Sequence, residues 1–312
     1  MVKKIINLVS GGAGFLGSHL IDSLIKNGEK VICIDNFISG KEENLFEWIN
    51  HPNFEFIHHD IVNPINLGVD KIWHLACPAS PKIYEKNSLE TIKTNFSGTF
   101  NMLELSKKNE AKILITSSSA IYGNPQMHPQ LETYFGSVNS FGERSCYEEG
   151  KRIAETLSFE YQKVHNCDIR IARIFNCYGP KMNSNDGRVI TNFIVQALNN
   201  KPITIYGDGS QTRSFCFIDD LIKALFLLME SNYKKPMNIG SDDEVKIIDL
   251  AKLIKKMTNS NSNFVFRELP INDPLRRKPS ILLAKEKLNW YPKENLNEGL
   301  NKTIRFFREN LI

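Results

Sequence analysis

A tyrosine and a lysine lie four residues apart in the segment "SCYEEGKR", residues 145–152. Residues at this spacing share one face of a helix, so we expect Tyr147 and Lys151 to point the same way. A phenol with an ordinary pKa of about 10 is only ~0.1% ionised at neutral pH, which is too little for an efficient base. An ammonium group held nearby stabilises the phenolate and lowers the pKa of the phenol. The pair therefore predicts a base for the proton of an alcohol, although this spacing also occurs by chance.

A glycine-rich segment near the start of the chain, "GGAGFLG", follows a short apolar stretch and opens an amphipathic one. Gly11, Gly14 and Gly17 have the spacing of a loop that joins a strand to a helix and lets the backbone approach a pyrophosphate. The free N–H groups at the start of the helix favour the anion. The segment predicts a dinucleotide site, although many strand-to-helix turns contain a glycine or two.

Acidic residues end the next two predicted strands. Asp35 follows the glycine loop at the distance where a carboxylate accepts hydrogen bonds from the adenosine ribose. The same carboxylate repels a 2′-phosphate, and Asn36 and Phe37 supply no arginine to offset it, so NAD is favoured over NADP. Asp60 could bind the adenine amino group, and it could equally be a turn residue or a helix cap.

A serine-rich segment, "TSSSAIYG" (residues 116–123), follows another apolar stretch. We expect that strand to end on the nicotinamide side of the cofactor, where Ser118 would offer a hydroxyl group to the substrate. Serine is also common in turns at strand ends. Together with Tyr147 and Lys151, however, Ser118 completes the set of groups that an alcohol-oxidising site needs.

The elements that must position these residues alternate between strand and helix. The predicted strands are apolar through most of their length, which indicates a parallel sheet covered by helices on both faces. The strands are predicted over 5–10, 30–35, 54–60, 71–76, 111–119 and 168–176. The helices are predicted over 15–28, with Gly28 in the left-handed conformation that ends it, and over 88–108 and 147–165.

The pattern loosens after Pro180. Helices are predicted over 187–200 and 218–230, whereas 203–215 and 270–281 read as basic, loop-rich segments that favour a role in substrate binding. We therefore predict an α/β chain with a doubly wound Rossmann domain and a smaller C-terminal substrate-binding α/β domain. The first would cover 1–178 and be rejoined by parts of 214–240, and the second would cover most of 179–312.

Composition indicates an ordinary soluble globular protein, with 312 residues, 41% of them hydrophobic and 24% charged. A net charge of +4 gives no reason to expect nucleic acid or a membrane as a partner. The six cysteines are scattered without metal-binding spacing, so we expect reduced thiols, no metal site and a cytoplasmic location. The N-terminal apolar run is too short for a secretory signal, and no run approaches the length of a membrane helix.

Several segments together resemble the extended short-chain dehydrogenase/reductases, and within them the UDP-glucuronate decarboxylases (UDP-xylose synthases). They include "GGAGFLGSHL", "HLACPASP", "SCYEEGKRIAET", "NDGRVITNFI", "YGDGSQTRSF" and "DPLRRKPSI". The resemblance covers nearly the whole chain. It implies oxidation at C4 of the sugar with NAD, loss of carbon dioxide from the 4-keto acid, protonation at C5 and re-reduction at C4. It also implies a homodimer through the helices near 88–108 and 147–165.

The resemblance implies site residues position by position. Tyr147 would be the base, Lys151 its electrostatic partner, and Ser118 would stand where the family usually has threonine. The implied cofactor-binding residues are Gly11, Gly14, Phe15, Leu16, Gly17, Asp35, Asn36, Phe37, Asp60, Ile61, Leu75, Thr94, Tyr147 and Lys151. The implied residues around the UDP-sugar are Lys93, Ser118, Asn176, Arg188, Tyr206, Gln211, Arg213 and Arg277. Arginine suits a diphosphate because its planar fork offers paired donors, although each arginine could instead form a surface ion pair.

One position departs from the family pattern. The decarboxylases usually have glutamate where this chain has Ala120, and a small residue there is more typical of sugar 4-epimerases. Besides decarboxylation, a UDP-glucuronate or UDP-hexose 4-epimerase and a non-catalytic NAD-binding protein therefore stay open. Without the glutamate, the C5 proton is expected to come from a water held by Ser118 or Ser119, or from Tyr147.

Overall fold

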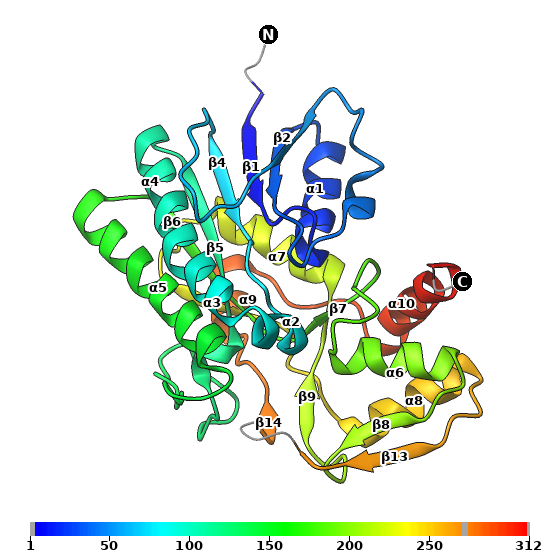
Figure 1. Ribbon diagram of the computed structural model, residues 1–312. Helices are drawn as coiled ribbons and strands as arrows, with labels where there is room; N and C mark the ends of the chain where they lie inside the picture. The colour runs from blue at the N-terminus through cyan, green and yellow to red at the C-terminus, as the bar shows by residue number, and fades with distance from the viewer. Residues whose placement is uncertain (1–3, 270–273, 311–312) are drawn as a thin grey trace.

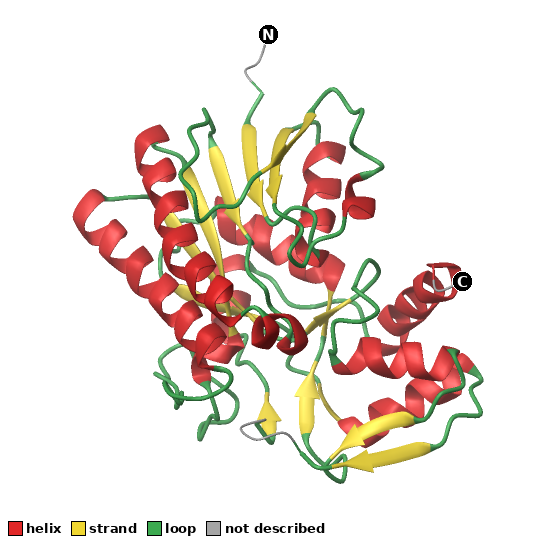
Figure 2. Cartoon of the chain, in the orientation of Figure 1, coloured by secondary structure: helices red, strands yellow, loops and turns green. Residues whose placement is uncertain are grey.

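The computed structural model of the chain describes residues 4–269 and 274–310 (Figure 1). The basic segment predicted over 270–281 begins outside the described residues, so only its part from residue 274 onward can be placed. Figure 2 shows a large sheet flanked by helices, with a smaller group of helices and strands beside it.

Seven parallel strands form the large sheet. Their order is β11-β6-β5-β4-β1-β2-β3, so the direction of winding reverses between β4 and β1. The predicted parallel Rossmann sheet and its six strands are confirmed, whereas β11, from the second half of the chain, was not predicted. The strands are β1 (Ile6–Ser10), β2 (Lys30–Asp35), β3 (Phe54–His58), β4 (Lys71–His74), β5 (Lys112–Ser118), β6 (Ile169–Ile174) and β11 (Pro236–Ile239).

Helices cover both faces of this sheet, as Figure 1 shows. On one face α1 (Phe15–Lys26) packs against α7 (Ile218–Glu230), and on the other α4 (Thr99–Asn109) packs against α5 (Ser145–His165). The predicted left-handed residue after α1 is confirmed, since Gly28 has a φ of +80°. The helix predicted over 88–108 is continuous with α4 but contains a π-helical turn. Its first pieces are α3 (Ser88–Lys93) and η2 (Thr94–Gly98).

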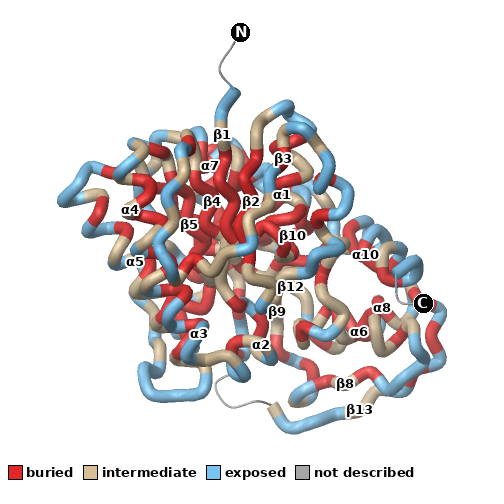
Figure 3. Tube along the Cα trace, turned by 45° about the horizontal axis from the view of Figure 1, so that its top comes forward, coloured by how far each residue is buried: buried red, intermediate tan, exposed pale blue. Residues whose placement is uncertain are grey.

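The core of the large unit lies along the central strands. Leu8, Val9, Ile72 and Leu114 are completely buried, because apolar side chains on both faces of the sheet meet a layer of helices. Figure 3 shows this burial concentrated on β1, β2, β4 and β5. The strands therefore hold their carboxyl ends, and the loops that follow them, in fixed positions.

The smaller unit is built mainly on α6 (Val189–Leu198), α8 (Ile247–Thr258) and α10 (Leu296–Asn310). The loop-rich prediction for 203–215 is wrong, because that segment contains β8 and β9. Ile203 and Ile205 are fully buried on one side of β8, which gives the alternation of a strand. Two small sheets complete this unit. In one, β8 (Ile203–Tyr206) pairs with β13 (Phe264–Arg267), and in the other β9 (Thr212–Ser214) lies between β12 (Glu244–Lys246) and β14 (Arg276–Arg277).

Short elements join the two units. The strand pair β7 (Cys177–Tyr178) and β10 (Cys216–Phe217) connects them, and α9 (Leu282–Leu288) packs against β11. The other short helices are η1 (Glu42–Leu45), α2 (Pro81–Lys86) and η3 (Ser119–Tyr122). Both α2 and η3 follow carboxyl ends of sheet strands.

The turn between β1 and α1 depends on two glycines. Gly11 has a φ of +74°, and a Cβ there would lie 2.7 Å from the backbone of Ala76. A Cβ on Gly17 would lie 2.2 Å from the carbonyl oxygen of Gly11 and 2.6 Å from the Cα of Gly12. Because the colliding atoms belong to the backbone, no side-chain rotation can relieve them. The loop can stay closed against the sheet only with glycine at both positions.

Replacing Gly17 with alanine is expected to destabilise the chain by about 1–3 kcal/mol, because the added methyl group forces the loop backbone apart. Denaturant unfolding measures the change. Gly68→Ala is the matched control, since nothing lies within 4 Å of its added Cβ and its φ is not positive. That variant should change stability by no more than about 1 kcal/mol, and in the stabilising direction if at all. Equal destabilisation of both variants would contradict the steric argument.

Candidate active site

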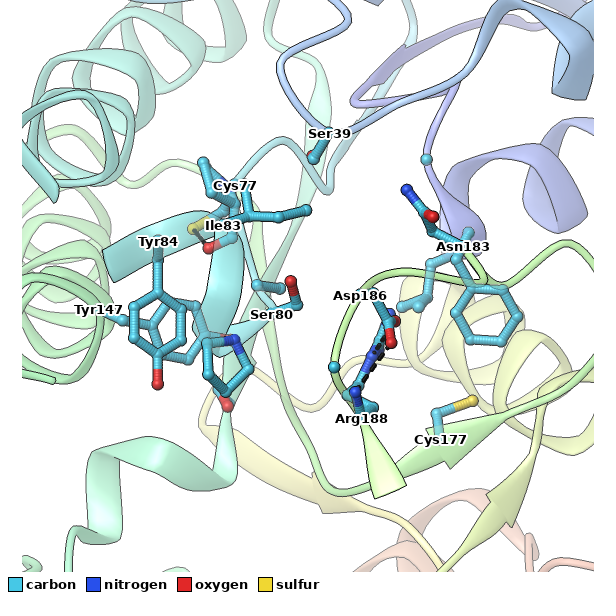
Figure 4. Close-up of a pocket in the computed structure, with 18 of the residues that line it drawn as sticks. Ser39, Cys77, Ser80, Ile83, Tyr84, Tyr147, Cys177, Asn183, Asp186 and Arg188 are labelled. Atoms are coloured by element: carbon cyan, nitrogen blue, oxygen red, sulfur yellow. Dashed lines mark hydrogen bonds and ion pairs between the residues drawn. The ribbon is translucent and has the colours of Figure 1, made fainter. Parts of the chain in front are cut away.

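A cavity of about 790 Å³ lies where the carboxyl ends of the central strands meet the smaller unit. Its walls come from the glycine loop, the ends of β2 and β5, the start of α5, and the segments around α6, β8 and β9. This is the side of a doubly wound sheet, next to the reversal of strand order, where ligands usually bind. Figure 4 shows a close-up of the cavity with Tyr147 on one wall and Arg188 on another.

The predicted catalytic residues meet in this cavity. Tyr147 is buried in the first turns of α5, and the Ser118 side chain at the end of β5 lies close enough to its hydroxyl to act toward a lower pKa. Lys151 lies one turn further along α5, with Nζ 5.9 Å from the centre of the Tyr147 ring. Its ammonium group donates a hydrogen bond of 2.8 Å to the carbonyl oxygen of Thr116, which fixes it below the tyrosine.

The net effect of the protein on the pKa of Tyr147 is a rise, contrary to the expectation from its spacing to Lys151. Burial raises this pKa to about 12, and this effect exceeds the lowering by the Ser118 hydrogen bond and by the charges of Arg188 and Arg144. The physical reason is that the phenol is taken out of water, and the charges that lower its pKa most are those of Arg188 and Arg144 and not that of Lys151. An additional positive charge near the ring is needed to make Tyr147 an efficient base.

The glycine loop fits a pyrophosphate. Gly14 lines the cavity, and a Cβ there would meet only the Gly11 carbonyl oxygen, at 3.2 Å, so its cavity side is open backbone. Gly14 is also the N-cap of α1, and no side chain caps the helix. The N–H groups of the first turn therefore lack intrahelical partners and face a site that favours an anion. Phe15, Leu16 and Gly17 line the same wall.

Asp35 lies in the cavity wall with its carboxylate already oriented. Its two oxygens accept hydrogen bonds from the backbone N–H groups of Ala13 (2.9 Å) and Phe37 (2.8 Å). Burial raises the pKa of Asp35, and these backbone hydrogen bonds act against that rise. A carboxylate has further acceptor positions, so ribose hydroxyls can still bind to it. Asn36 also lines the cavity, whereas Phe37 does not and stacks on His58 instead.

The remaining predicted cofactor residues lie around the same end of the cavity. Asp60 lines it, and its Oδ1 also accepts a hydrogen bond from the Val62 N–H, so the turn role foreseen for it is present. The other predicted cofactor residues found in the wall are Ile61, Leu75 and Thr94. Among the described residues, no group of three or more histidine, cysteine or acidic side chains could hold a metal ion.

Arginines form the opposite wall. Arg213 on β9 and Arg277 on β14 are adjacent in register and both about nine-tenths buried. Like charges side by side repel, so an anion between them is favoured. Arg188 also lines the cavity, and its Nε donates to Asp186 at 2.6 Å. The other predicted residues present in this part of the cavity wall are Asn176, Tyr206 and Gln211.

Lys93 is the one predicted substrate residue that the cavity does not include. It is exposed on the last turn of α3, whereas the next residue, Thr94, is buried and lines the cavity. A one-residue step turns a helical side chain by about 100°, which separates these two neighbours. The described geometry therefore gives Lys93 no contact with the cavity.

Sequence reasoning missed several cavity residues in the segment "HLACPASP" and in the helix that follows it. Cys77, Ser80 and Tyr84 all line the cavity near Tyr147 (Figure 4). The Tyr84 ring stacks on the Tyr147 ring with centroids 5.0 Å apart and planes inclined by 4°. Ala120 is buried in the same cluster. The motif signalled the segment, but nothing local in it shows which side chains face α5.

Three comparisons with known proteins agree with this geometry. A family model described as "NAD dependent epimerase/dehydratase family" matches residues 7–240. The chain is 51% identical over 305 residues to UDP-glucuronic acid decarboxylase 2 of Arabidopsis thaliana, covering 98% of this chain and 68% of that protein. It superposes on UDP-glucose 4-epimerase of Thermotoga maritima, crystallised with UDP-glucose, with a TM-score of 0.90 and 31% identity, covering 99% and 100% of the two chains.

A second similar structure contains both a UDP-sugar and NAD. It is UDP-glucuronic acid 4-epimerase of Bacillus cereus in complex with UDP-glucuronic acid and NAD, with a TM-score of 0.88 and 28% identity, covering 98% of this chain and 99% of that one. The whole chain therefore shares its fold with the epimerase structures, while its sequence is much closer to the decarboxylase. Among the described residues, no helix has the length and apolarity needed to cross a membrane.

The exposure of the six cysteines predicts which thiol reacts first. Cys77 is partly exposed, whereas the other five cysteines are buried, and burial raises the pKa of Cys33, Cys146, Cys167, Cys177 and Cys216. Iodoacetamide should alkylate Cys77 at least about tenfold faster than any other cysteine in the native protein, because each pKa unit costs tenfold in thiolate. Peptide mass spectrometry over time gives the order, and Cys77→Ser should abolish the fast phase. A buried cysteine reacting first would contradict the described cavity.

Proposed function

We infer, because the chain belongs to the NAD dependent epimerase/dehydratase family, that it decarboxylates UDP-glucuronate to UDP-xylose and uses NAD as a recycled cofactor. The observation that carries this is the difference in identity, since the decarboxylase relative is 51% identical over nearly the whole chain and the epimerase structures are 28–31% identical. A cavity with a serine, a tyrosine and a lysine at one end and arginines at the other supports it.

The glycine loop and the acidic strand ends are proposed to hold NAD. Gly11, Gly14 and Gly17 would cradle its pyrophosphate, and Asp35 would accept the hydroxyls of the adenosine ribose. Bound there, NAD would supply the acceptor for a hydride from C4 of the sugar and would give it back at the end of the reaction. The positive charge of its nicotinamide ring also favours the phenolate form of Tyr147.

Tyr147 is proposed to remove the proton of the C4 hydroxyl group and later return it to the same oxygen. Ser118 would orient that hydroxyl, since its side chain lies beside the hydroxyl of Tyr147. Lys151 would hold the site's positive charge in place through its bond to the Thr116 carbonyl. The resulting ketone at C4 is beta to the C6 carboxylate, so carbon dioxide can leave while the electron pair is taken up as an enolate. No metal ion is needed for that step.

The substrate's diphosphate is proposed to bind the arginine wall. Arg213 and Arg277 lie in register on adjacent strands, and Arg188 faces the cavity from the start of α6. Their paired N–H donors match the oxygens of a diphosphate. We propose accordingly that residues 1–178, rejoined by parts of 214–240, bind NAD, and that 179–312 bind most of the UDP-sugar.

The direct test is product analysis after incubation with UDP-glucuronate and NAD. We expect release of carbon dioxide and formation of UDP-xylose by mass spectrometry. Tyr147→Phe keeps the ring stacked on Tyr84 but removes the hydroxyl group, so its turnover should fall by at least about 100-fold, as for loss of a general base. Tyr178→Phe is the control, because Tyr178 is equally buried but does not line the cavity.

Three outcomes would contradict the proposal. A product of unchanged mass would make the chain a 4-epimerase, the function that Ala120 favours. Near-normal turnover of Tyr147→Phe would remove the assigned base. Cofactor binding with no turnover of any UDP-sugar would instead indicate a non-catalytic protein.

We also propose that the chain forms a homodimer through α3, η2, α4 and α5. Leu89, Ile92, Phe96 and Phe100 are each at least 43% exposed, and their spacing of three and four residues places them on one helical face. Phe159 on the adjoining α5 is 57% exposed. An apolar face of this extent across two packed helices is typical of a surface that is covered in an assembly. A second copy is the occupant that fits, because each copy offers the same face.

Light scattering after size exclusion should find a dimer of the wild-type chain. Phe96→Glu should shift it to a monomer, because the new charge would be buried at the interface without a partner. Phe266→Glu is the control, since Phe266 is 54% exposed on β13, away from this face. A monomeric wild-type chain, or an unaffected dimer in Phe96→Glu, would exclude this interface.

The location is proposed to be the cytoplasm. All six cysteines are free thiols in the structure. Thiols persist in reducing compartments and tend to pair in oxidising ones.

A further inference from the structure

A buried carboxylate on the cavity wall is devoted to a single arginine. Asp186, in the loop before α6, is 2% exposed. Its Oδ2 accepts a hydrogen bond of 2.6 Å from the Nε of Arg188, and its Oδ1 accepts one of 2.9 Å from the backbone N–H of the same residue. Within the described part of the chain, this carboxylate has no other hydrogen-bond partner. Because a buried carboxylate is costly unless it is paired, Asp186 and Arg188 form one structural unit.

Two further contacts fix this unit against the rest of the cavity wall. The guanidinium group of Arg188 lies over the ring of Phe15, 5.7 Å from its centre, and Phe15 is the first residue of α1. The side chain of Asn192 in α6 donates a hydrogen bond of 2.9 Å to the carbonyl oxygen of Gly187, which joins the loop to the helix. Arg188 is therefore held at its backbone, at Nε and on one flat face, as Figure 4 shows for its bonds to Asp186.

The outer end of the Arg188 fork stays available to a ligand. Its side chain is 33% exposed and lines the cavity. Nη1 and Nη2 have no hydrogen-bond partner among the residues that the structure describes. Because Nε is bound to Asp186, these two groups offer a pair of parallel N–H donors, which match two oxygens of one phosphate group.

The place of Arg188 in the cavity indicates which phosphate it meets. The charge of Arg188 acts on Tyr147 and lowers the pKa of its phenol, so the guanidinium group lies toward the catalytic end. A UDP-sugar that presents its sugar to Tyr147 brings the phosphate bonded to the sugar nearest to that end. The phosphate on the uridine side then lies further away, where Arg213 and Arg277 are adjacent in register.

We propose that Asp186 is a positioning residue, which holds Arg188 so that its Nη1 and Nη2 bind the phosphate nearest to the sugar. This rests on the proposed function and deepens it. Arg188 makes the contact with the substrate, whereas Asp186 acts only through Arg188. Because the sugar is bonded directly to that phosphate, fixing the phosphate also limits where C4 can lie relative to Tyr147.

Calorimetric titration with UDP and with UMP tests this assignment, because UMP lacks the sugar-side phosphate. Asp186→Asn keeps the shape of the side chain but has one oxygen for two donors, and its amide group faces the other donor. The Kd of this variant for UDP should rise at least about tenfold, the range of a lost hydrogen bond to a charged group, while its Kd for UMP stays that of the wild-type chain. Its KM for UDP-glucuronate should rise likewise, with kcat within about threefold.

A second variant guards against a folding defect. Asp186→Glu keeps a negative charge beside Arg188 but lengthens the side chain by one methylene, so it displaces the guanidinium group without leaving the ion pair uncompensated. It should show the same selective loss of UDP affinity. Titration with NAD reports whether either variant is folded, since NAD binding is expected to be unchanged.

A double-mutant cycle tests whether Asp186 acts through Arg188. Combining Asp186→Asn with Arg188→Ala should weaken UDP binding no more than Arg188→Ala alone, because residues that serve one contact are not additive. Asp168→Asn is the matched control. Asp168 also accepts a 2.6 Å bond from an arginine, Arg170, but neither residue lines the cavity, so UDP and UMP affinities should not change.

Each other outcome counts against the proposal. Unchanged UDP affinity in Asp186→Asn would overturn it. Equal weakening of UDP and UMP would also overturn it, because the loss would then come from a general disturbance of the site. Weaker binding of NAD with unchanged binding of UDP would assign Arg188 to the pyrophosphate of the cofactor. Additive effects in the cycle would show that Asp186 does not act through Arg188.

The two proposals fail in distinguishable ways. If the wild-type chain releases no carbon dioxide from UDP-glucuronate, but Asp186→Asn selectively weakens UDP, the decarboxylase function is overturned and the role of Asp186 stands. If carbon dioxide is released and the UDP affinity of Asp186→Asn is unchanged, the function stands and the role of Asp186 is overturned.

Discussion

The site depends above all on the packing of α5 against the end of β5. Tyr147, Lys151 and Glu155 are spaced by four residues, so they lie along one face of the helix and reach the same strand. On β5 they meet three consecutive residues. Tyr147 lies beside the Ser118 side chain, Lys151 donates to the Thr116 carbonyl, and Glu155 accepts from the Ser117 hydroxyl. A helix shifted by one residue would lose all three contacts together, so the position of the base and the register of the helix are one constraint.

That contact is tied into the sheet through a buried ion pair. Arg173 on β6 donates from Nε and Nη2 to the two carboxylate oxygens of Glu155, at 3.0 and 2.8 Å. Arg173 also donates a hydrogen bond of 2.9 Å to the hydroxyl of Tyr122. Tyr122 ends η3, the short helix that directly follows Ser118 and contains Ala120. Removing one partner would leave a charge without compensation away from water, which is more costly than the pair's own net contribution. Arg173 on the sheet thus holds α5 and η3 in place at the catalytic end through Glu155 and Tyr122, which do not touch the substrate.

Much of this arrangement could be predicted because its signals are local. Continuous apolar runs marked six strands, and the glycine spacing with Asp35 marked the dinucleotide end. The predictions that were missing or wrong depend on contacts between segments that are distant in sequence. The pairing of Tyr84 with Tyr147 exists only because α2 packs against α5, and no pattern near either residue reports it. The predicted direction of the pKa shift of Tyr147 was wrong for the same reason, since burial is set by the whole fold and outweighs a neighbouring charge.

Ala120 need not argue for epimerisation once its surroundings are considered. An epimerase and a decarboxylase share the oxidation at C4 and differ in the fate of the C6 carboxylate. Loss of carbon dioxide moves the negative charge from the compact carboxylate into the enolate, where it is spread over C5 and O4, so a wall that solvates the carboxylate poorly favours that loss. Ala120 packs with Cys146 and two aromatic rings, which offer far less solvation than a polar wall would. The same substitution that removes a carboxylate from this wall therefore makes the substrate's own carboxylate easier to lose.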